Sequence, residues 1–163
     1  MVNKRILLVV DAQYDFMMPN GKLYVPEAEQ LIVPMIELLA TAKDKYHCVF
    51  FTQDWHYEWD YEGSEEAKEF PRHCIAHSYG ADLVFSLRQI QIPYLIQQKS
   101  VFDVWESGFD KEFVYWKNFT SEKPIVDVIG VASDYCVKYA VDGLLARGYE
   151  VNVIKELTKG IHE

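Results

Sequence analysis

The chain has 163 residues, half of them apolar and a quarter charged, which is enough for one domain with a sizeable core and too little for two. Its formal charge of −9, with no Lys/Arg cluster longer than a pair, argues against a phosphate-binding surface, so nucleic acid is not an expected partner. The sequence has no apolar run long enough to span a bilayer and no signal-peptide pattern. We therefore expect a cytoplasmic protein without a membrane partner.

Five short apolar runs rich in β-branched residues predict the strands of the fold. They lack the strict alternation of half-buried strands and are typical of strands buried on both faces, as in a parallel sheet. In chain order they cover residues 6–10, 48–52, 94–97, 125–130 and 151–154. Apolar residues with helical spacing lie between them, over residues 27–42 and 135–147, and Gly148 is placed to end the second helix.

Strands that alternate with helices indicate right-handed βαβ units. We therefore predict a single α/β domain over residues 1–163, built as a three-layer open parallel sheet with helices on both faces. No internal repeat or Pro/Gly linker marks a domain boundary. The longest irregular segment, residues 53–80, carries three of the five histidines, and loops of this length are usually functional or disordered.

Chemically reactive side chains directly follow four of the predicted strands. Asp11 follows the first strand, Asp54 and His56 follow the second, Lys99 follows the third, and Cys136 follows the fourth. In a parallel sheet these positions share one edge, which is where α/β proteins bind their ligands. The sequence thus predicts that a carboxylate, a candidate metal pair, an ammonium and a thiol meet at this edge.

Cys136 has the predicted position of a nucleophile. The three cysteines are odd in number and form no C-x-x-C pair, which indicates neither a disulfide framework nor a zinc knuckle. Cys136 lies where a predicted helix begins, and the helix dipole and the nearby Lys99 should both favour the thiolate, while Asp11 can accept its proton. Taken singly, these residues also fit plainer roles as a core cysteine, a solvated lysine and a turn-capping aspartate. Because the predicted fold brings all three residues to one edge of the sheet, we favour the catalytic interpretation.

Asp54, His56 and His73 predict a metal site in the long loop. Asp54 and His56 are two residues apart and so lie on the same side of an extended segment. A carboxylate and two imidazoles with open positions suit a catalytic divalent metal, for which we expect zinc, with iron or manganese as alternatives. Glu62 and Glu66 are both available as a fourth ligand, and a charged surface loop that binds no metal is the alternative.

Four segments, in order along nearly the whole chain, resemble the nicotinamidases and their isochorismatase-like cysteine hydrolase relatives. They are ILLVVDAQYDF at residues 6–16, TQDWH at 52–56, FPRHC at 70–74 and GVASDYCV at 130–137. The last segment is the most specific and the opening of the first is the least. The resemblance implies an isochorismatase-like, Rossmann-like fold and a catalytic triad of Asp11, Lys99 and Cys136.

The resemblance also implies how a substrate would be held. A cis peptide would fall at Val131–Ala132 and would aim the N–H groups of Ala132 and Cys136 at the substrate oxygen, as an oxyanion hole. Phe16 and Phe70 would sandwich a pyridine ring, although both also fit as ordinary core residues.

Two departures from the family pattern concern the metal shell and the C-terminus. Glu62 stands where many nicotinamidases have a second histidine, and we expect it to complete the shell, with Glu66 as the alternative; the other expected ligands are Asp54, His56 and His73. The closing helix of the family has no match after the last predicted strand. We therefore expect a domain that lacks its C-terminal helix or is completed in a homo-oligomer.

The motifs together favour an amide hydrolase, specifically a nicotinamidase that converts nicotinamide and water to nicotinate and ammonia through a cysteine thioester. A related cysteine amidohydrolase acting on a carbamoyl or ureido compound is the first alternative, because residues 100–105 depart from the best-known nicotinamidases. Isochorismatase itself needs no metal, so the predicted metal ligands argue against it. A non-catalytic binding module on the same fold is the alternative from another class. The expected partner is a small-molecule amide.

Overall fold

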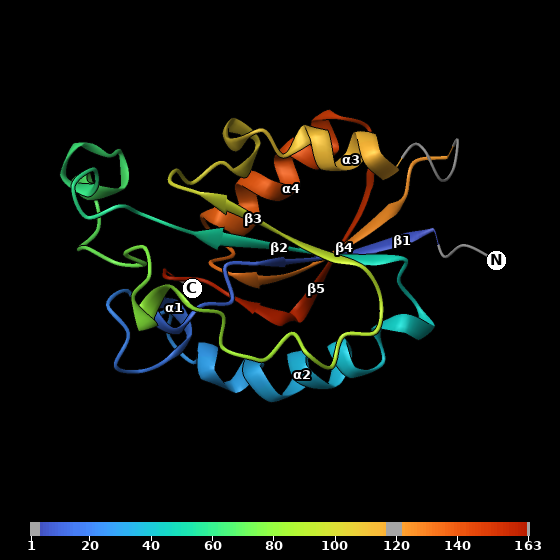
Figure 1. Cartoon of the computed structure of the whole chain (residues 1–163), viewed down its shortest axis with the longest axis horizontal. Helices are drawn as coiled ribbons and strands as arrows, with labels where there is room; N and C mark the ends of the chain where they lie inside the picture. Colours follow the sequence, from blue (N-terminus) through green and yellow to red (C-terminus); the bar gives the residue numbers. More distant parts are fainter. Residues whose placement is uncertain (1–3, 117–121, 163) are drawn as a thin grey trace.

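A central sheet of five parallel strands organises the computed structural model, which describes residues 4–116 and 122–162 (Figure 1). The strand order is β3-β2-β1-β4-β5, and each neighbouring pair is parallel. The strands are β1 Arg5–Val10, β2 Cys48–Asp54, β3 Tyr94–Lys99, β4 Ile125–Val131 and β5 Glu150–Lys159. All five predicted strands are confirmed. The last is longer than predicted, because a register shift between Val128 and Gly130 lets β5 pair with β4 as far as Lys159.

Helices cover both faces of the sheet, which confirms the predicted three-layer α/β architecture. In Figure 1, α1 (Tyr14–Met17) and α2 (Ile32–Ala40) lie on one face, and α3 (Asp110–Trp116) and α4 (Cys136–Ala146) lie on the other. The short helices α1 and α3 were not predicted. Within the described part of the chain, no helix is long and apolar enough to cross a lipid bilayer.

The helix predicted over residues 27–42 is divided into three pieces. A 3-10 turn at Ala28–Leu31 precedes α2, and a second at Ala42–Asp44 follows it. Proline has no N–H to donate and is tolerated only in the first turn of an α-helix. Because α2 begins at Ile32, Pro34 lies in that first turn. The second predicted helix is confirmed as α4.

Strand β1 contributes to an apolar core on each face of the sheet. Leu7 and Val9 belong to the core beneath α2, whereas Ile6, Leu8 and Val10 belong to the core beneath α4. All five side chains are fully buried. This two-sided burial explains why the strand sequence has no polar alternation, and it holds the end of β1, with the residue that follows it, in a fixed position.

A buried carboxylate joins the strands at the opposite end of the sheet from the strand ends that carry the reactive residues. Asp127 on β4 is fully buried and accepts hydrogen bonds from the Tyr46 hydroxyl at 2.6 Å and from Arg5 Nη2 at 3.1 Å. Asn152 donates to the same carboxylate at 3.3 Å, and Lys45 Nζ lies 3.3 Å from it. Burial alone would raise the pKa of Asp127, but these donors lower it below the ordinary value of 3.8.

We expect Asp127→Asn to destabilise the fold by about 1–3 kcal/mol at neutral pH, because it removes charge-assisted hydrogen bonds inside the protein. A carboxyl whose folded pKa is lowered stabilises the fold above its unfolded pKa and loses that contribution as pH falls. The difference in the free energy of unfolding between wild type and variant should therefore shrink as the pH falls below 3.8. Urea unfolding at several pH values measures it. Asp142→Asn, in an exposed pair with Lys138, is the control and should change stability by under about 1 kcal/mol.

Candidate active site

Asp11, Lys99 and Cys136 meet at the carboxyl edge of the sheet, as predicted. Asp11 directly follows β1, Lys99 is the last residue of β3, and Cys136 is the first residue of α4. Lys99 Nζ lies 2.9 Å from Asp11 Oδ2 and donates to Cys136 Sγ at 3.4 Å. The three residues are 0%, 3% and 7% exposed. One ammonium thus lies between a buried carboxylate and a buried thiol.

The position of Asp11 is set by the strand beside it. Asp11 has a left-handed backbone with φ of 47°, and its N–H donates to Thr52 on β2. The Thr52 hydroxyl in turn donates to Asp11 Oδ1 at 2.7 Å. The other carboxylate oxygen is left facing Lys99.

The turn that leads to Cys136 begins at the end of β4, where the backbones of β4 and β1 approach closely. Gly130 has φ of 121°, and a Cβ atom there would lie 2.1 Å from the Val10 carbonyl oxygen, so no larger residue fits. The cis peptide Val131–Ala132 follows, as the resemblance implied. The amides of Tyr135 and Val137, on either side of Cys136, both donate to the Ala132 carbonyl oxygen.

Burial dominates the electrostatics of the triad. It raises the pKa of the Asp11 carboxyl, against the attraction of Lys99, and it raises the pKa of the Cys136 thiol well above the ordinary 9.0. The carboxylates of Asp11 and Asp54 disfavour the thiolate further. The charge of Lys99 lowers the pKa of the thiol, as predicted, but the raising effects outweigh it, so the net direction runs against the predicted thiolate. The Asp11 carboxyl, whose pKa is also raised, contacts the same ammonium as the thiol.

A second buried cluster lies against the triad and contains Asp54, His56, Glu66 and His73, whose candidate ligand atoms all lie within 4.8 Å of one another. The Nε2 atoms of His56 and His73 lie 2.9 and 3.0 Å from Asp54 Oδ2. They lie 2.8 and 2.9 Å from Glu66 Oε2. Lys99 Nζ lies 3.2 Å from the other oxygen of Asp54, so this carboxylate joins the cluster to the triad.

The expectation that Glu62 completes this cluster is wrong, because Glu66 takes that position. The Glu62 side chain is 77% exposed and lies 3.5 Å from Arg72 Nη1. The two glutamates lie in successive 3-10 turns. In Tyr61–Gly63 the buried residue is Tyr61 and Glu62 is exposed, whereas in Glu66–Lys68 the buried residue is Glu66. Sequence spacing left both open, and the residue that each turn buries decides between them.

The four clustered side chains are suited to hold a divalent cation. Burial alone would lower the pKa of both histidines, but the adjoining carboxylates raise them to about 9 for His56 and about 10 for His73. The site therefore favours positive charge at its centre. Glu66 Oε1 is buried without a hydrogen-bond partner, which leaves a free ligand atom. Two imidazoles and two carboxylates are a donor set that zinc, iron and manganese accept.

Cys136 of the triad and three members of the cluster, Asp54, Glu66 and His73, border a common cavity of about 10 Å³, the size of about one water molecule. Phe16 and Phe70, the two predicted substrate-binding aromatics, both line it, as does Ala132. Phe102 and Tyr135 also line the cavity, and no sequence motif predicted them there. Their rings lie 5.9 and 5.2 Å from the ring of Phe70. Both residues lie close in sequence to the predicted triad, Phe102 after Lys99 and Tyr135 before Cys136, and that proximity was the available signal.

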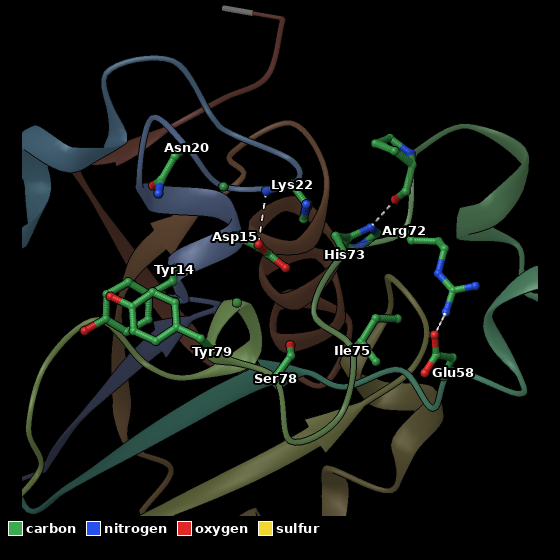
Figure 2. A pocket seen from close by; sticks show the side chains of 13 residues that line it. Tyr14, Asp15, Asn20, Lys22, Glu58, Arg72, His73, Ile75, Ser78 and Tyr79 are labelled. Atoms are coloured by element: carbon green, nitrogen blue, oxygen red, sulfur yellow. Dashed lines mark hydrogen bonds and ion pairs between the residues drawn. The ribbon is translucent and has the colours of Figure 1, made fainter.

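A larger pocket of about 730 Å³ also borders His73 but is lined by none of the triad residues (Figure 2). Figure 2 shows Tyr14 and Tyr79 at one side of it, with stacked rings whose centroids are 4.1 Å apart. His73 Nδ1 lies 2.7 Å from the Pro71 carbonyl oxygen, which orients the imidazole so that Nε2 faces the cluster. Cys136, Asp54 and Glu66 therefore border the smaller cavity and not this one.

The sequence matches the family model described as Isochorismatase domain over residues 5–163. A nicotinamidase from Saccharomyces cerevisiae is 29% identical, over 98% of this chain and 89% of that protein. The crystal structure of the pyrazinamidase of Pyrococcus horikoshii in complex with zinc is 31% identical, with a TM-score of 0.79 over 97% of this chain and 87% of that one. The yeast nicotinamidase bound to the inhibitor nicotinaldehyde is 26% identical, with a TM-score of 0.73 over 96% of this chain and 88% of that one. The chain therefore belongs to the Isochorismatase domain family.

Proposed function

We propose that the protein is a nicotinamidase, which hydrolyses nicotinamide to nicotinate and ammonia. The observation that carries this proposal is the contact of Lys99 with both Asp11 and Cys136, because Cys136 in turn lines an aromatic-walled cavity. The activities named for the yeast and Pyrococcus relatives support the same reaction class.

In the first half of the reaction, Asp11 takes the proton of the Cys136 thiol as the sulfur attacks the amide carbonyl carbon. The N–H groups of Ala132 and Cys136 stabilise the resulting oxyanion. Asp11 then gives its proton to the leaving nitrogen, ammonia departs, and a thioester remains on Cys136. Lys99 stays protonated and holds the carboxylate and the sulfur in place.

In the second half, Asp11 takes a proton from a water molecule that attacks the thioester carbonyl. The same two amides stabilise the second oxyanion. The carbon–sulfur bond breaks, the proton on Asp11 returns to the sulfur, and nicotinic acid leaves. The atoms balance, because nicotinamide and one water give nicotinic acid and ammonia, and the proton that the acid loses on forming nicotinate converts ammonia to ammonium.

We propose zinc as the metal held by Asp54, His56, Glu66 and His73. When bound there, zinc supplies a Lewis-acid site at the wall of the cavity. The donor set supports the choice, as does the zinc in the Pyrococcus structure, while iron and manganese remain the alternatives.

Separate replacement of Glu66 and Glu62 by glutamine tests which of the two glutamates is a metal ligand. We expect Glu66→Gln to weaken zinc binding by at least about tenfold, because a ligand carboxylate becomes a neutral amide. Glu62→Gln is the matched control and should bind zinc as the wild type does, since that side chain is 77% exposed. Competition against a chromophoric chelator measures both affinities without any enzyme assay. If Glu62→Gln weakened zinc binding and Glu66→Gln did not, Glu62 would be the metal ligand in place of Glu66.

Ammonia release from nicotinamide tests the proposed function. We expect equimolar ammonia and nicotinate from the zinc-loaded protein, and a nicotinoyl group on the peptide that contains Cys136 when the reaction is quenched by acid. The peptides of Cys48 and Cys74 should stay unmodified. No ammonia release from nicotinamide would reject the proposal.

The small cavity favours a second candidate, hydrolysis of a carbamoyl or ureido compound by the same triad. A space of about 10 Å³ admits a pyridine ring only if lining side chains move, whereas a small acyclic amide needs less movement. Parallel ammonia assays with carbamoyl and ureido compounds decide between the candidates. No ammonia from any of these substrates would leave the binding module as the better hypothesis.

A further inference from the structure

The segment that follows β5 is tied to the turn that carries the nucleophile. The Ser133 N–H donates to the Lys159 carbonyl oxygen at 2.8 Å. The Asp134 carboxylate then accepts from two successive amides: Ile161 N–H at Oδ1 and His162 N–H at Oδ2, both at 2.9 Å. Three hydrogen bonds thus join residues 133–134 to residues 159–162.

A further contact lies one residue closer to the nucleophile. The Tyr135 hydroxyl lies 3.2 Å from His162 Nε2, and the two rings are 5.9 Å apart. Asp134 and Tyr135 immediately precede Cys136. The position of the C-terminal segment is therefore set by the same turn that places the reacting sulfur.

The side chain of Ile161 lines the catalytic cavity together with Cys136. Ile161 also packs against the apolar core that contains Phe16, one of the proposed ring-binding residues. No motif in the sequence pointed to Ile161, because it lies 25 residues after the nucleophile and outside the matched segments.

We propose that Ile161 is a specificity-determining residue that limits the size of the acyl group accepted by the site, and that Asp134 is the positioning residue that holds it there. The identity of the substrate, a small planar aromatic amide, rests on the proposed function. The size limit itself rests on the cavity and on the hydrogen bonds of Asp134. A ring substituent directed toward Ile161 is excluded while that segment is held in place.

The two oxygens of Asp134 make the arrangement specific to a carboxylate. Both partners are N–H donors, so both side-chain positions must be acceptors. An asparagine would offer one acceptor oxygen and turn an NH₂ group toward the second N–H. Asp134→Asn should therefore loosen the segment, whereas Ile161→Ala removes the wall and leaves the segment held.

Selectivity between two substrates tests the proposal. We expect Ile161→Ala to raise the ratio of kcat/KM for a ring-methylated nicotinamide over nicotinamide by about tenfold or more, the scale of one to two methylene groups in a pocket. Asp134→Asn should raise the same ratio to a smaller extent. Ile96→Ala, at a 41% exposed residue on β3, and Asp142→Asn, in an exposed pair, are the matched controls and should leave the ratio unchanged.

Alkylation of Cys136 gives a readout that does not depend on the substrate. We expect Ile161→Ala to raise the rate with bulky N-phenylmaleimide relative to small iodoacetamide by several-fold, with Cys136 followed by peptide mass spectrometry. A wild type that releases no ammonia from nicotinamide would reject the proposed function, and the alkylation ratio would still test the size limit. If the kcat/KM ratio and the alkylation ratio of Ile161→Ala both equalled those of the wild type, the inference would be overturned. If the kcat/KM ratio of Asp134→Asn equalled that of the wild type, Asp134 would not be a positioning residue.

Discussion

Cys136→Ala should lower the turnover of nicotinamide by at least about 10³-fold, because no other described group lies where the thioester is formed. The Cys136 sulfur accepts a hydrogen bond from Lys99 and borders the cavity together with the proposed oxyanion donor Ala132. Loss of a nucleophile from a group of residues that act together removes nearly all of their joint contribution to the rate.

The control for this substitution is a cysteine of the same burial outside the site. Cys48 is also 7% exposed but begins β2, and burial raises its pKa to about 12. Cys48→Ala should keep wild-type kcat and lose only stability, in proportion to the small volume removed from the core. Initial-rate ammonia assays on the two variants measure the contrast. Normal turnover in Cys136→Ala would exclude the thioester mechanism.

Asp11→Asn should lower kcat by about 10²–10⁴-fold with little change in KM, because the amide keeps the shape of the carboxylate but accepts no proton. An asparagine keeps the acceptor for Thr52 but turns an NH₂ group toward the Lys99 ammonium, so we expect the variant to lose some stability as well. Circular dichroism and thermal unfolding of the variant measure that loss. Asp142→Asn, at the surface, is the control and should retain wild-type kcat.

The wild-type enzyme should also show a pH limit set by Asp11. A general base works only when it is deprotonated, and burial raises the pKa of this carboxyl above its usual 3.8. Activity should therefore fall as pH drops through that raised value, and this limb should be absent from the residual activity of Asp11→Asn. A pH profile of kcat for both proteins tests this, and the same acid limb in the variant would assign it to another group.

Most of the sheet could be predicted because its strands are buried on both faces and their apolar runs are continuous. The run from Ile6 to Val10, for example, has a fully buried side chain at every position. The rule that parallel strands end at one edge then brought Asp11, Lys99 and Cys136 together without any structural information. The short helices were missed because α1 has only four residues, too few to show a helical period.

The parts of the site that could not be predicted depend on turn geometry and on surroundings in three dimensions. The choice between Glu62 and Glu66 depended on which residue each 3-10 turn buries, which is Tyr61 in the first turn and Glu66 in the second. The pKa of the Cys136 thiol depends on burial, on Lys99 and on the carboxylates of Asp11 and Asp54, and these tertiary surroundings are not visible in local sequence. Ile161 lines the cavity in a segment that tertiary hydrogen bonds, including those of Asp134, join to the turn before Cys136.

Asp54 connects the candidate metal cluster with the proposed triad, because its carboxylate contacts residues of both. One of its oxygens faces the two histidines and the other faces Lys99. A ligand that withdraws negative charge from one oxygen changes the field at the other, and such coupling between two sites is reciprocal by linkage. Whatever factor the bound cation contributes to the affinity of the cavity for a ligand, that ligand must contribute to the affinity for the cation. The affinity for the cation should therefore differ between the free protein and the protein with a ligand held at Cys136, by the same factor by which the cation changes the affinity for that ligand.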